Sequence, residues 1–215
     1  MSATLLVNEI FISIQGESTF AGRVCVFVRL TGCNLDCAWC DTQYAKTEGE
    51  SMTVDEVVAR VESFGCPLVE VTGGEPLTQP GSLELMTRLA DRGLTVLLET
   101  NGSVDIGAVD GRVVKIVDVK CPSSGEFEKN LWSNLGLVSQ QDQVKFVLAS
   151  RADYEWARGV VAKYGLIGQC EVLFSPVANA LSARELAGWI VADRLAVRLG
   201  IQLHKVIWPG VDRGV

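Results

Sequence analysis

Short runs of apolar, mostly β-branched residues recur along the chain. Few polar residues interrupt them, a pattern typical of mostly buried strands. Between several of the runs, apolar residues return every three or four positions, which is the period of a helix. We predict strands at residues 24–31, 68–72, 94–99, 113–119, 143–148, 170–174 and 201–207.

Helix-start signals lie between some of these runs. Thr53 and Glu56 have the spacing of a capping box, Ser182 and Glu185 repeat it, and a third helical stripe follows Ser150. The apolar positions of the three helices are Val54, Val57, Val58 and Val61; Leu186, Trp189 and Ile190; and Tyr154, Ala157, Val161 and Tyr164. Strands that alternate with helices indicate parallel β-α-β units, and therefore an α/β barrel or open sheet.

The chain of 215 residues fits one domain, residues 1–215. The only long region without a clear pattern, roughly residues 120–142, is too short to form a second domain. In parallel α/β folds, chemistry gathers at the carboxyl ends of the strands. The motifs described below follow predicted strands, so we expect a site at that end.

Composition and charge narrow the expected partners. The net charge of −7 argues against nucleic acid as a direct partner. No stretch approaches the ~20 apolar residues of a membrane span, and the N-terminus lacks the basic region of a signal peptide. Seven cysteines are an odd number and too few for a secreted disulfide scaffold of this length. We therefore expect a cytoplasmic protein with reduced thiols and no membrane partner.

Three cysteines, Cys33, Cys37 and Cys40, follow the strand at 24–31 in the spacing C-x-x-x-C-x-x-C. A structural zinc ion needs four ligands, and the lone histidine, His204, is far away in the sequence. A 4Fe-4S cluster held by three thiolates leaves one iron open to a substrate or cofactor. Buried cysteines without a ligand role are the third interpretation. The spacing, directly after a strand and a glycine, favours the cluster.

A second motif, Thr72-Gly73-Gly74-Glu75-Pro76, directly follows the strand at 68–72. Alone, it would more often be an ordinary turn. It gains weight because it lies one strand and one helix after the cysteines, where glycines would allow close approach to the backbone.

The cysteine spacing, with Trp39 before the last cysteine, and the GGEP sequence together resemble the radical S-adenosylmethionine superfamily. The resemblance implies that the open iron chelates the amino and carboxylate groups of S-adenosylmethionine. It places the methionyl amino group against Gly73 and Gly74, beside Glu75.

Within that superfamily, the chain resembles the 7-carboxy-7-deazaguanine synthase family from end to end. The likeness rests on Glu9-Ile10-Phe11, Ile14-Gln15-Gly16-Glu17, Arg29, Leu203-His204-Lys205 and Arg213-Gly214-Val215. It implies an incomplete (partial) β/α barrel of mostly parallel strands. The implied reaction converts 6-carboxy-5,6,7,8-tetrahydropterin to 7-carboxy-7-deazaguanine with loss of ammonia, on the route to queuosine and related deazapurines. It further implies flavodoxin or ferredoxin as electron donor, and we expect a homodimer.

The resemblance also implies a set of substrate contacts. A pterin with a carboxylate needs a guanidinium and several hydrogen-bonding groups around a flat ring. Arg29 could hold the carboxylate and Glu17 could accept from the exocyclic amine. The other candidates are Ile14, Gln15, Gly16, Thr72, His204 and Val215. An internal salt bridge explains Arg29 nearly as well, and a lone histidine is more often structural.

Magnesium and cofactor contacts follow from the same resemblance. Thr42 matches a position that ligates Mg²⁺ through its hydroxyl, with waters and the substrate carboxylate completing the set; a turn cap is the alternative. S-adenosylmethionine contacts are expected from Trp39, Gly73, Gly74, Glu75, Asp118, Val119, Lys120, Ser175 and Pro176. Residues 99–102, at another strand end, are expected to line the pocket.

The chain departs from the family pattern at two places. Many family members have Ser-Pro-Lys where this chain has Asp118-Val119-Lys120, which puts a side-chain contact from residue 118 in doubt. Ser18 stands where glycine is more usual, at a cost in backbone freedom.

The resemblance implies no catalytic side chain, because the 5'-deoxyadenosyl radical takes hydrogen from C6 of the substrate. The protein holds the radical carbon and C6 adjacent and excludes water. Two alternatives remain. A glycyl-radical-enzyme activase needs an open face for a protein loop, and a non-catalytic metal-binding module predicts a fourth protein ligand and no use for GGEP.

Overall fold

The computed structural model describes residues 2–211 and 213–215. Within them, nine strands form one sheet in the order β3-β1-β2-β4-β5-β6-β7-β8-β9. Every neighbouring pair from β2 to β9 is parallel, whereas β1 is antiparallel to both β2 and β3. The strands are β1 Thr4–Ile14, β2 Val24–Leu30, β3 Glu50–Thr53, β4 Leu68–Gly73, β5 Thr95–Thr100, β6 Val114–Val119, β7 Gln143–Leu148, β8 Glu171–Pro176 and β9 Arg198–Leu199.

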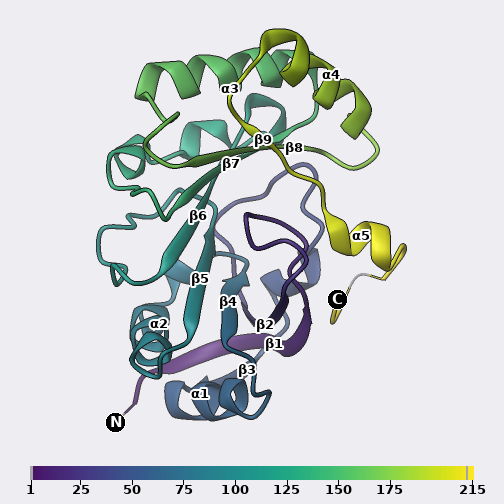
Figure 1. The fold of residues 1–215 in the computed structure, drawn as a ribbon. Helices are drawn as coiled ribbons and strands as arrows, with labels where there is room; N and C mark the ends of the chain where they lie inside the picture. Colours follow the sequence, from purple (N-terminus) through teal and green to yellow (C-terminus); the bar gives the residue numbers. More distant parts are fainter. Residues whose placement is uncertain (1, 212) are drawn as a thin grey trace.

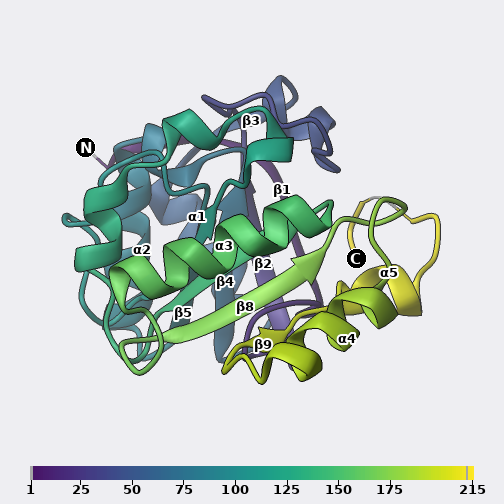
Figure 2. The same ribbon diagram turned by 90° about the horizontal axis from the view of Figure 1, so that it is seen from above.

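The helices α1 to α4 lie on the outside of the curved sheet (Figure 1), and seen from above, α3 Arg151–Tyr164 and α4 Ala183–Asp193 lie on either side of β8 (Figure 2). Both predicted capping boxes are present, at Thr53 and Ser182. The helices are α1 Val54–Glu62, α2 Gly81–Asp91, α3 Arg151–Tyr164, α4 Ala183–Asp193 and α5 Leu203–Ile207, with short 3-10 helices at Gln43–Lys46, Pro76–Thr78, Pro122–Ser124, Phe127–Lys129 and Trp132–Gly136. None of the described helices is long and apolar enough to cross a membrane.

The sheet curls without closing, so the predicted incomplete β/α barrel is confirmed. The segment after β9 crosses the open side between β8 and the β1–β2 loop. It begins with a bond from the Gly200 backbone N–H to the Phe174 carbonyl (2.9 Å), and the Leu203 N–H then donates to the Gly16 carbonyl (2.9 Å). The chain itself therefore spans the gap between the two sides of the sheet.

Six of the seven predicted strands are confirmed, with ends that differ by at most two residues. The prediction of a strand at residues 201–207 is wrong, because Leu203–Ile207 forms the helix α5. A short apolar run does not by itself distinguish strand from helix, and Val206 and Ile207 are exposed on the surface. The long strand β1 was not predicted, since Asn8 and Glu9 interrupt its apolar run and the register shifts between Val7 and Glu9.

Buried polar residues mark the inner face of the sheet. Asp118 pairs in register with Lys145, and Arg29 pairs with Thr72. The β1–β2 loop fills the interior at the amino ends of the strands, where the Thr19 N–H donates to Gln143 Oε1 (2.9 Å) and Gln143 Nε2 donates back to the Thr19 hydroxyl (2.8 Å). The polar interior is therefore blocked at that end and faces the carboxyl ends of the strands.

The β1–β2 loop contains the residue that departs from the family pattern. Ser18 has a φ of 63°, in the left-handed region where glycine is favoured. Its hydroxyl accepts a hydrogen bond from the Phe20 N–H (3.1 Å), which ties the turn locally.

Candidate active site

The loop between β2 and the 3-10 helix at Gln43–Lys46 holds all three cysteines of the C-x-x-x-C-x-x-C motif. Cys33, Cys37 and Cys40 are partly exposed free thiols. Two bonds attach this loop to the segment after β6: the Ala38 N–H donates to the Ser124 carbonyl (3.0 Å), and the Asp36 N–H donates to Glu126 Oε1 (3.0 Å). Burial raises the pKa of the Cys37 thiol, and the nearby Lys120 ammonium opposes that rise.

The three thiols are the donor set that a 4Fe-4S cluster takes. Among the described residues, no three His, Cys, Asp or Glu side chains are grouped so as to hold one metal ion. That finding concerns a single ion, whose ligands crowd around one centre. The thiolates of a cluster each bind a different iron, so they need not converge in this way.

The GGEP strand end is packed directly against the start of the cysteine loop. The Gly74 N–H donates to the Leu30 carbonyl (3.1 Å), and the Glu75 N–H donates to the Gly32 carbonyl (2.8 Å). A Cβ atom at Gly73 would overlap the Leu30 backbone, and one at Gly74 would overlap the Gly32 backbone. The glycines are therefore required for this close approach, and the φ of 136° at Gly73 needs glycine as well.

Glu75 is fully buried and its carboxylate is used within the protein. It accepts hydrogen bonds from the Leu77 N–H (3.0 Å), the Thr100 hydroxyl (2.9 Å) and the Asn101 N–H (2.7 Å). The side chain thus ties the end of β4 to the end of β5. The cofactor contact expected from Glu75 stays a prediction.

Asn101, at the end of β5, reaches a predicted cluster ligand. Its Nδ2 donates to Cys33 Sγ (3.7 Å) and to Asn34 Oδ1 (3.0 Å). Its Oδ1 accepts from the Ser103 N–H (2.9 Å) and hydroxyl (2.6 Å), which fixes the orientation of the amide. The sequence placed residues 99–102 at the pocket, but it offered no sign of this contact with sulfur.

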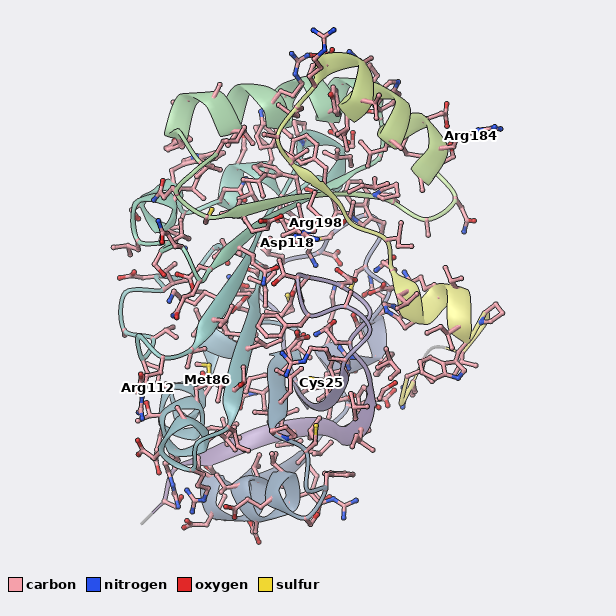
Figure 3. The ribbon with its side chains drawn as sticks, viewed as in Figure 1. Cys25, Met86, Arg112, Asp118, Arg184 and Arg198 are labelled. Carbon is pink, nitrogen blue, oxygen red and sulfur yellow. The ribbon has the colours of Figure 1, made fainter. Side chains whose placement is uncertain are left out.

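The end of β6 holds an acceptor without a donor. Asp118 Oδ1 is buried and has no hydrogen-bond partner among the described residues, and Figure 3 shows Asp118 in the interior of the molecule. Asp118 Oδ2 pairs with Lys120 Nζ (2.8 Å). Burial lowers the pKa of Lys120, but the charges of Asp118 and Cys37 outweigh burial and hold that pKa above its usual value. A buried oxygen of this kind is suited to a donor on a ligand, such as a ribose hydroxyl.

The other predicted cofactor residues also lie at or near the carboxyl ends of the strands. Val119 ends β6 and Ser175 and Pro176 end β8, while Trp39 is half-buried in the cysteine loop. The donor set and the unpartnered oxygen of Asp118 fit a cluster with S-adenosylmethionine at this end.

Lys145, on β7, is the centre of a buried group of charges that the sequence analysis missed. Its Nζ donates to Glu17 Oε2 (2.8 Å) and Glu99 Oε1 (2.5 Å) and lies 3.9 Å from Asp118 Oδ2. Glu17 Oε1 also accepts from Gln202 Nε2 (2.9 Å). A lysine within an apolar strand was the available signal, because a buried charge has to be paired.

The pKa values of the carboxyl groups around Lys145 are shifted in different directions. Burial raises the pKa of Glu99 to about 7, against the pull of Lys145. Burial and the charge of Glu99 raise the pKa of Glu70 to about 8. Burial acts in the same direction on Glu17, but Lys145 and Gln202 outweigh it and hold the Glu17 pKa below its usual value. Gln15 joins two of these residues, donating to Glu70 Oε2 (2.5 Å) and accepting from the Glu17 N–H (2.9 Å).

Arg29 makes the internal salt bridge considered above. Its Nε donates to Glu9 Oε1 (2.8 Å), an oxygen that also accepts from the Tyr44 hydroxyl (3.0 Å). Among the described residues, the two terminal nitrogens of Arg29 have no acceptor. Since Arg29 and Thr72 share the inner face, those nitrogens are available to a carboxylate there.

His204, although distant in the sequence, packs against the β1–β2 loop at Gly16. A Cβ atom at Gly16 would overlap the His204 imidazole, and burial lowers the pKa of this histidine. The same segment reaches the cysteine loop, because Lys205 Nζ pairs with Asp41 Oδ2 (2.7 Å). Ile14 ends β1 directly before Gln15, and Val215 is half-buried at the end of the tail.

Thr42 lies at the N-cap position of the 3-10 helix Gln43–Lys46 but makes no capping hydrogen bond. Its hydroxyl donates instead to the Asp41 carboxylate (3.1 Å). The capping alternative is therefore wrong in this structure, and the magnesium role stays a prediction.

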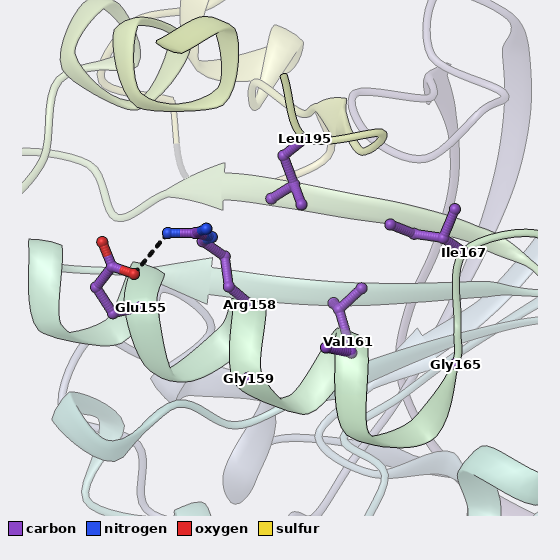
Figure 4. Close-up of a pocket in the computed structure, with 8 residues that line it drawn as sticks. Glu155, Arg158, Gly159, Val161, Gly165, Ile167 and Leu195 are labelled. Atoms are coloured by element: carbon purple, nitrogen blue, oxygen red, sulfur yellow. Dashed lines mark hydrogen bonds and ion pairs between the residues drawn. The ribbon is translucent and has the colours of Figure 1, made fainter. Parts of the chain in front are cut away.

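A separate groove of about 460 Å³ lies beside α3 (Figure 4). It is lined by Glu155, Arg158, Gly159, Val161, Ala162, Gly165, Ile167 and Leu195, none of which is a predicted site residue. Arg158 is paired with Glu155 within it (2.7 Å).

Comparisons with known proteins agree with this geometry. Residues 27–117 match the Radical SAM superfamily. The 7-carboxy-7-deazaguanine synthase of Chlorobaculum tepidum is 50% identical over 216 residues, covering 99% of this chain and 98% of the relative. The protein of that name from Koribacter versatilis is 44% identical, covering 97% and 99%. The crystal structure of QueE from Escherichia coli has a TM-score of 0.76 at 24% identity, covering 94% of this chain and 95% of that one, and shows the same fold.

Proposed function

The chain belongs to the 7-carboxy-7-deazaguanine synthase family of radical S-adenosylmethionine enzymes. We propose that it converts 6-carboxy-5,6,7,8-tetrahydropterin to 7-carboxy-7-deazaguanine with loss of ammonia. The relatives of that name match nearly the whole length of the chain. The observation in the structure that carries the proposal is the meeting of three elements at one end of the barrel: the cysteine loop, the Gly73-Gly74 strand end and the unpartnered oxygen of Asp118.

The residues of the chain bind and orient the reacting groups. When bound, the 4Fe-4S cluster and S-adenosylmethionine supply the 5'-deoxyadenosyl radical that takes hydrogen from C6 of the substrate. Cys33, Cys37 and Cys40 would hold the cluster, and Asp118 Oδ1, which is buried without a partner, would accept a hydrogen bond from a hydroxyl of S-adenosylmethionine. The terminal nitrogens of Arg29 bind the substrate carboxylate, and Glu17 accepts from the ring.

Exclusion of water is the second task of the chain. The β1–β2 loop blocks the interior at the amino ends of the strands through the paired hydrogen bonds of Thr19 and Gln143. The segment around Leu203 covers the open side of the barrel. A radical formed inside is thereby kept from solvent on both sides.

The remaining partners are part of the proposal. Thr42 would hold Mg²⁺ together with waters and the substrate carboxylate. We further propose that flavodoxin or ferredoxin delivers the electron and that the enzyme works as a homodimer in the cytoplasm. Omission of magnesium and a Thr42→Val variant test the metal, and sedimentation velocity tests the dimer. Unchanged activity without magnesium would contradict the first, and a monomer would contradict the second.

The experiment that tests the function is anaerobic incubation of the reconstituted protein with dithionite, S-adenosylmethionine and 6-carboxy-5,6,7,8-tetrahydropterin, followed by mass spectrometry. We expect the deazapurine from the wild type and none from Cys37→Ala. Cys66→Ala is the matched control, because Cys66 is buried away from the loop and bonds only to the Val24 and Leu68 carbonyls. Formation of 5'-deoxyadenosine without the deazapurine would refute the assigned substrate and keep the superfamily chemistry.

A further inference from the structure

We propose that Lys145 is a positioning residue for the substrate, whose ammonium holds Glu17 and Glu99 as a pair of carboxylates that receive the donor edge of the pterin ring. The proposal rests on the proposed function for the identity of the ring. It adds two residues, Lys145 and Glu99, to the recognition of that ring.

The geometry makes Lys145 the link between separate elements. Its side chain is 7% exposed, and its Nζ bonds to Glu17 of the β1–β2 loop and to Glu99 of β5. These partners lie 128 and 46 residues away in the sequence. One ammonium therefore fixes the distance between two carboxylates that no local structure brings together.

The carboxylates, rather than the lysine, have surface to offer a ligand. The side chains of Glu17 and Glu99 are 21% and 22% exposed, three times the exposed fraction of Lys145. Glu99 Oε2 has no hydrogen-bond partner among the described residues, and it is not fully buried. Glu99 therefore offers a ligand one oxygen without a partner, and each Glu17 oxygen accepts a single hydrogen bond and can accept a second.

The chemistry of a pterin matches these acceptors. The amino-pyrimidinone edge carries N–H donors on the exocyclic amine and on ring nitrogens, and an ionised carboxylate is an acceptor only. Charge-assisted bonds of this kind are short and directional. Glu17 and Glu99 would repel the carboxylate of the substrate. The guanidinium of Arg29, whose two terminal nitrogens have no acceptor among the described residues, would bind it instead. The two ends of the substrate are thus distinguished by charge.

Ionisation of Glu17 depends on Lys145. Burial raises the Glu17 pKa, and Lys145 is the largest influence that lowers it. The charged or titratable groups that act on Glu17 or on which it acts are Lys145, Glu99, Glu70, Asp41 and His204, and Asp118 lies against Lys145. Most are acidic, so loss of the lysine charge raises the Glu17 pKa and reduces its ionised fraction at a given pH.

The test compares Lys145→Gln, Lys145→Arg and Lys115→Gln in the reconstituted enzyme. Lys115 is the matched control, since it is also buried in a strand (8% exposed) and paired with one acid, Asp142 (3.1 Å). We expect Lys145→Gln to raise the KM for the pterin about tenfold or more while kcat changes much less. Its acid limb of kcat/KM moves to higher pH. Lys145→Arg recovers part of the loss, and Lys115→Gln leaves both quantities near wild type.

Folding and iron content are measured on every variant by circular dichroism and iron analysis. If Lys145→Gln does not fold, Glu99→Gln takes its place, since it keeps the shape of the side chain and one acceptor, and the same rise in KM is expected. A pterin KM and an acid limb unchanged in the folded variant would overturn the proposal, as would equal changes in Lys115→Gln. Failure of the wild type to make the deazapurine would overturn the proposed function, and this proposal with it.

Discussion

Two buried lysines on neighbouring strands have almost the same local sequence and opposite surroundings. Lys115 of β6 lies in Val-Lys-Ile and Lys145 of β7 in Val-Lys-Phe. Asp118 pairs in register with Lys145, and Lys115 lies three positions before Asp118, so the two lysines point to opposite faces of the sheet. The local pattern therefore does not tell which lysine belongs to a site.

The acids around the two lysines carry the difference. Near Lys115, Asp142 is fully buried and both its oxygens are occupied, by the Lys115 N–H, the Ser139 N–H and the Ser139 hydroxyl, each at 2.8 Å. Near Lys145, Asp118 Oδ1 is buried without a partner. Glu99 Oε2 also has no partner among the described residues and is not fully buried. The amino end of the barrel is satisfied within the protein, whereas the carboxyl end leaves acceptors open to a ligand.

The largest expected effects come from neutralising one acid at each end. Asp142→Asn leaves the Lys115 ammonium buried without its counter-charge, and we expect about 3 kcal/mol or more of lost stability in denaturant unfolding. Asp118→Asn is expected to cost less stability and to raise the KM for S-adenosylmethionine about tenfold, because it weakens an acceptor for the cofactor. A greater loss of stability in Asp118→Asn than in Asp142→Asn, together with an unchanged KM for S-adenosylmethionine, would contradict the difference between the two ends of the barrel.

A glycine at each end gives the next contrast. Gly74→Ala pushes a Cβ into the Gly32 backbone, so we expect the cysteine loop to shift and the iron retained after reconstitution to fall well below that of the wild type. A Cβ atom at Gly111, in the turn before β6, meets no atom within 4 Å. Gly111→Ala should therefore change stability by less than about 0.5 kcal/mol and leave iron content unchanged. Full iron loading of Gly74→Ala would contradict the requirement for close approach.

Glu70, which is buried next to the group of charges around Lys145, makes the stability of the protein depend on pH. Its pKa is raised from 4.5 to about 8 in the folded protein. The folded state then holds a proton that the unfolded state releases, so this contribution is complete below pH 4.5 and is lost as the pH rises through about 8. We expect Glu70→Gln to flatten this fall, which is at most about 1.4 kcal/mol per pH unit. If the unfolding free energies of wild type and Glu70→Gln change in parallel between pH 5 and 9, the pKa of Glu70 is not raised in the folded protein.

The smallest expected effect concerns the hydrogen bond from Asn101 to Cys33. Donors to the sulfurs of a cluster favour its reduced, more negative state, so Asn101→Ala should lower the midpoint potential in a spectroelectrochemical titration. Asn34→Ala is the control, because Asn34 accepts from the same amide but does not donate to the sulfur. An equal shift in both variants would assign the effect to the loop and not to the sulfur bond.

The sequence allowed prediction of those features whose residues lie close together in the chain. The cysteine spacing, the GGEP strand end, the two capping boxes and six strands all depend on residues within one short segment. The group around Lys145 depends on contacts between distant segments, and the strand pattern around that residue is indistinguishable from the one around Lys115. The hydrogen bond between Glu75 and Asn101 could not be predicted for the same reason, since the two residues lie 26 positions apart.

The segment that spans the open side of the barrel sets an order on assembly. Gln202 bonds to Glu17, Leu203 to Gly16 and Lys205 to Asp41, so the segment supports both the β1–β2 loop and the cysteine loop. A ribosome makes these residues after all nine strands, and chains begin to fold while they are being made. The pocket thus stays unsupported on one side until residues that follow every strand have been made. Completion of the pocket therefore depends on a segment that follows the whole sheet in the chain, and a sheet formed without this segment lacks one wall of the pocket.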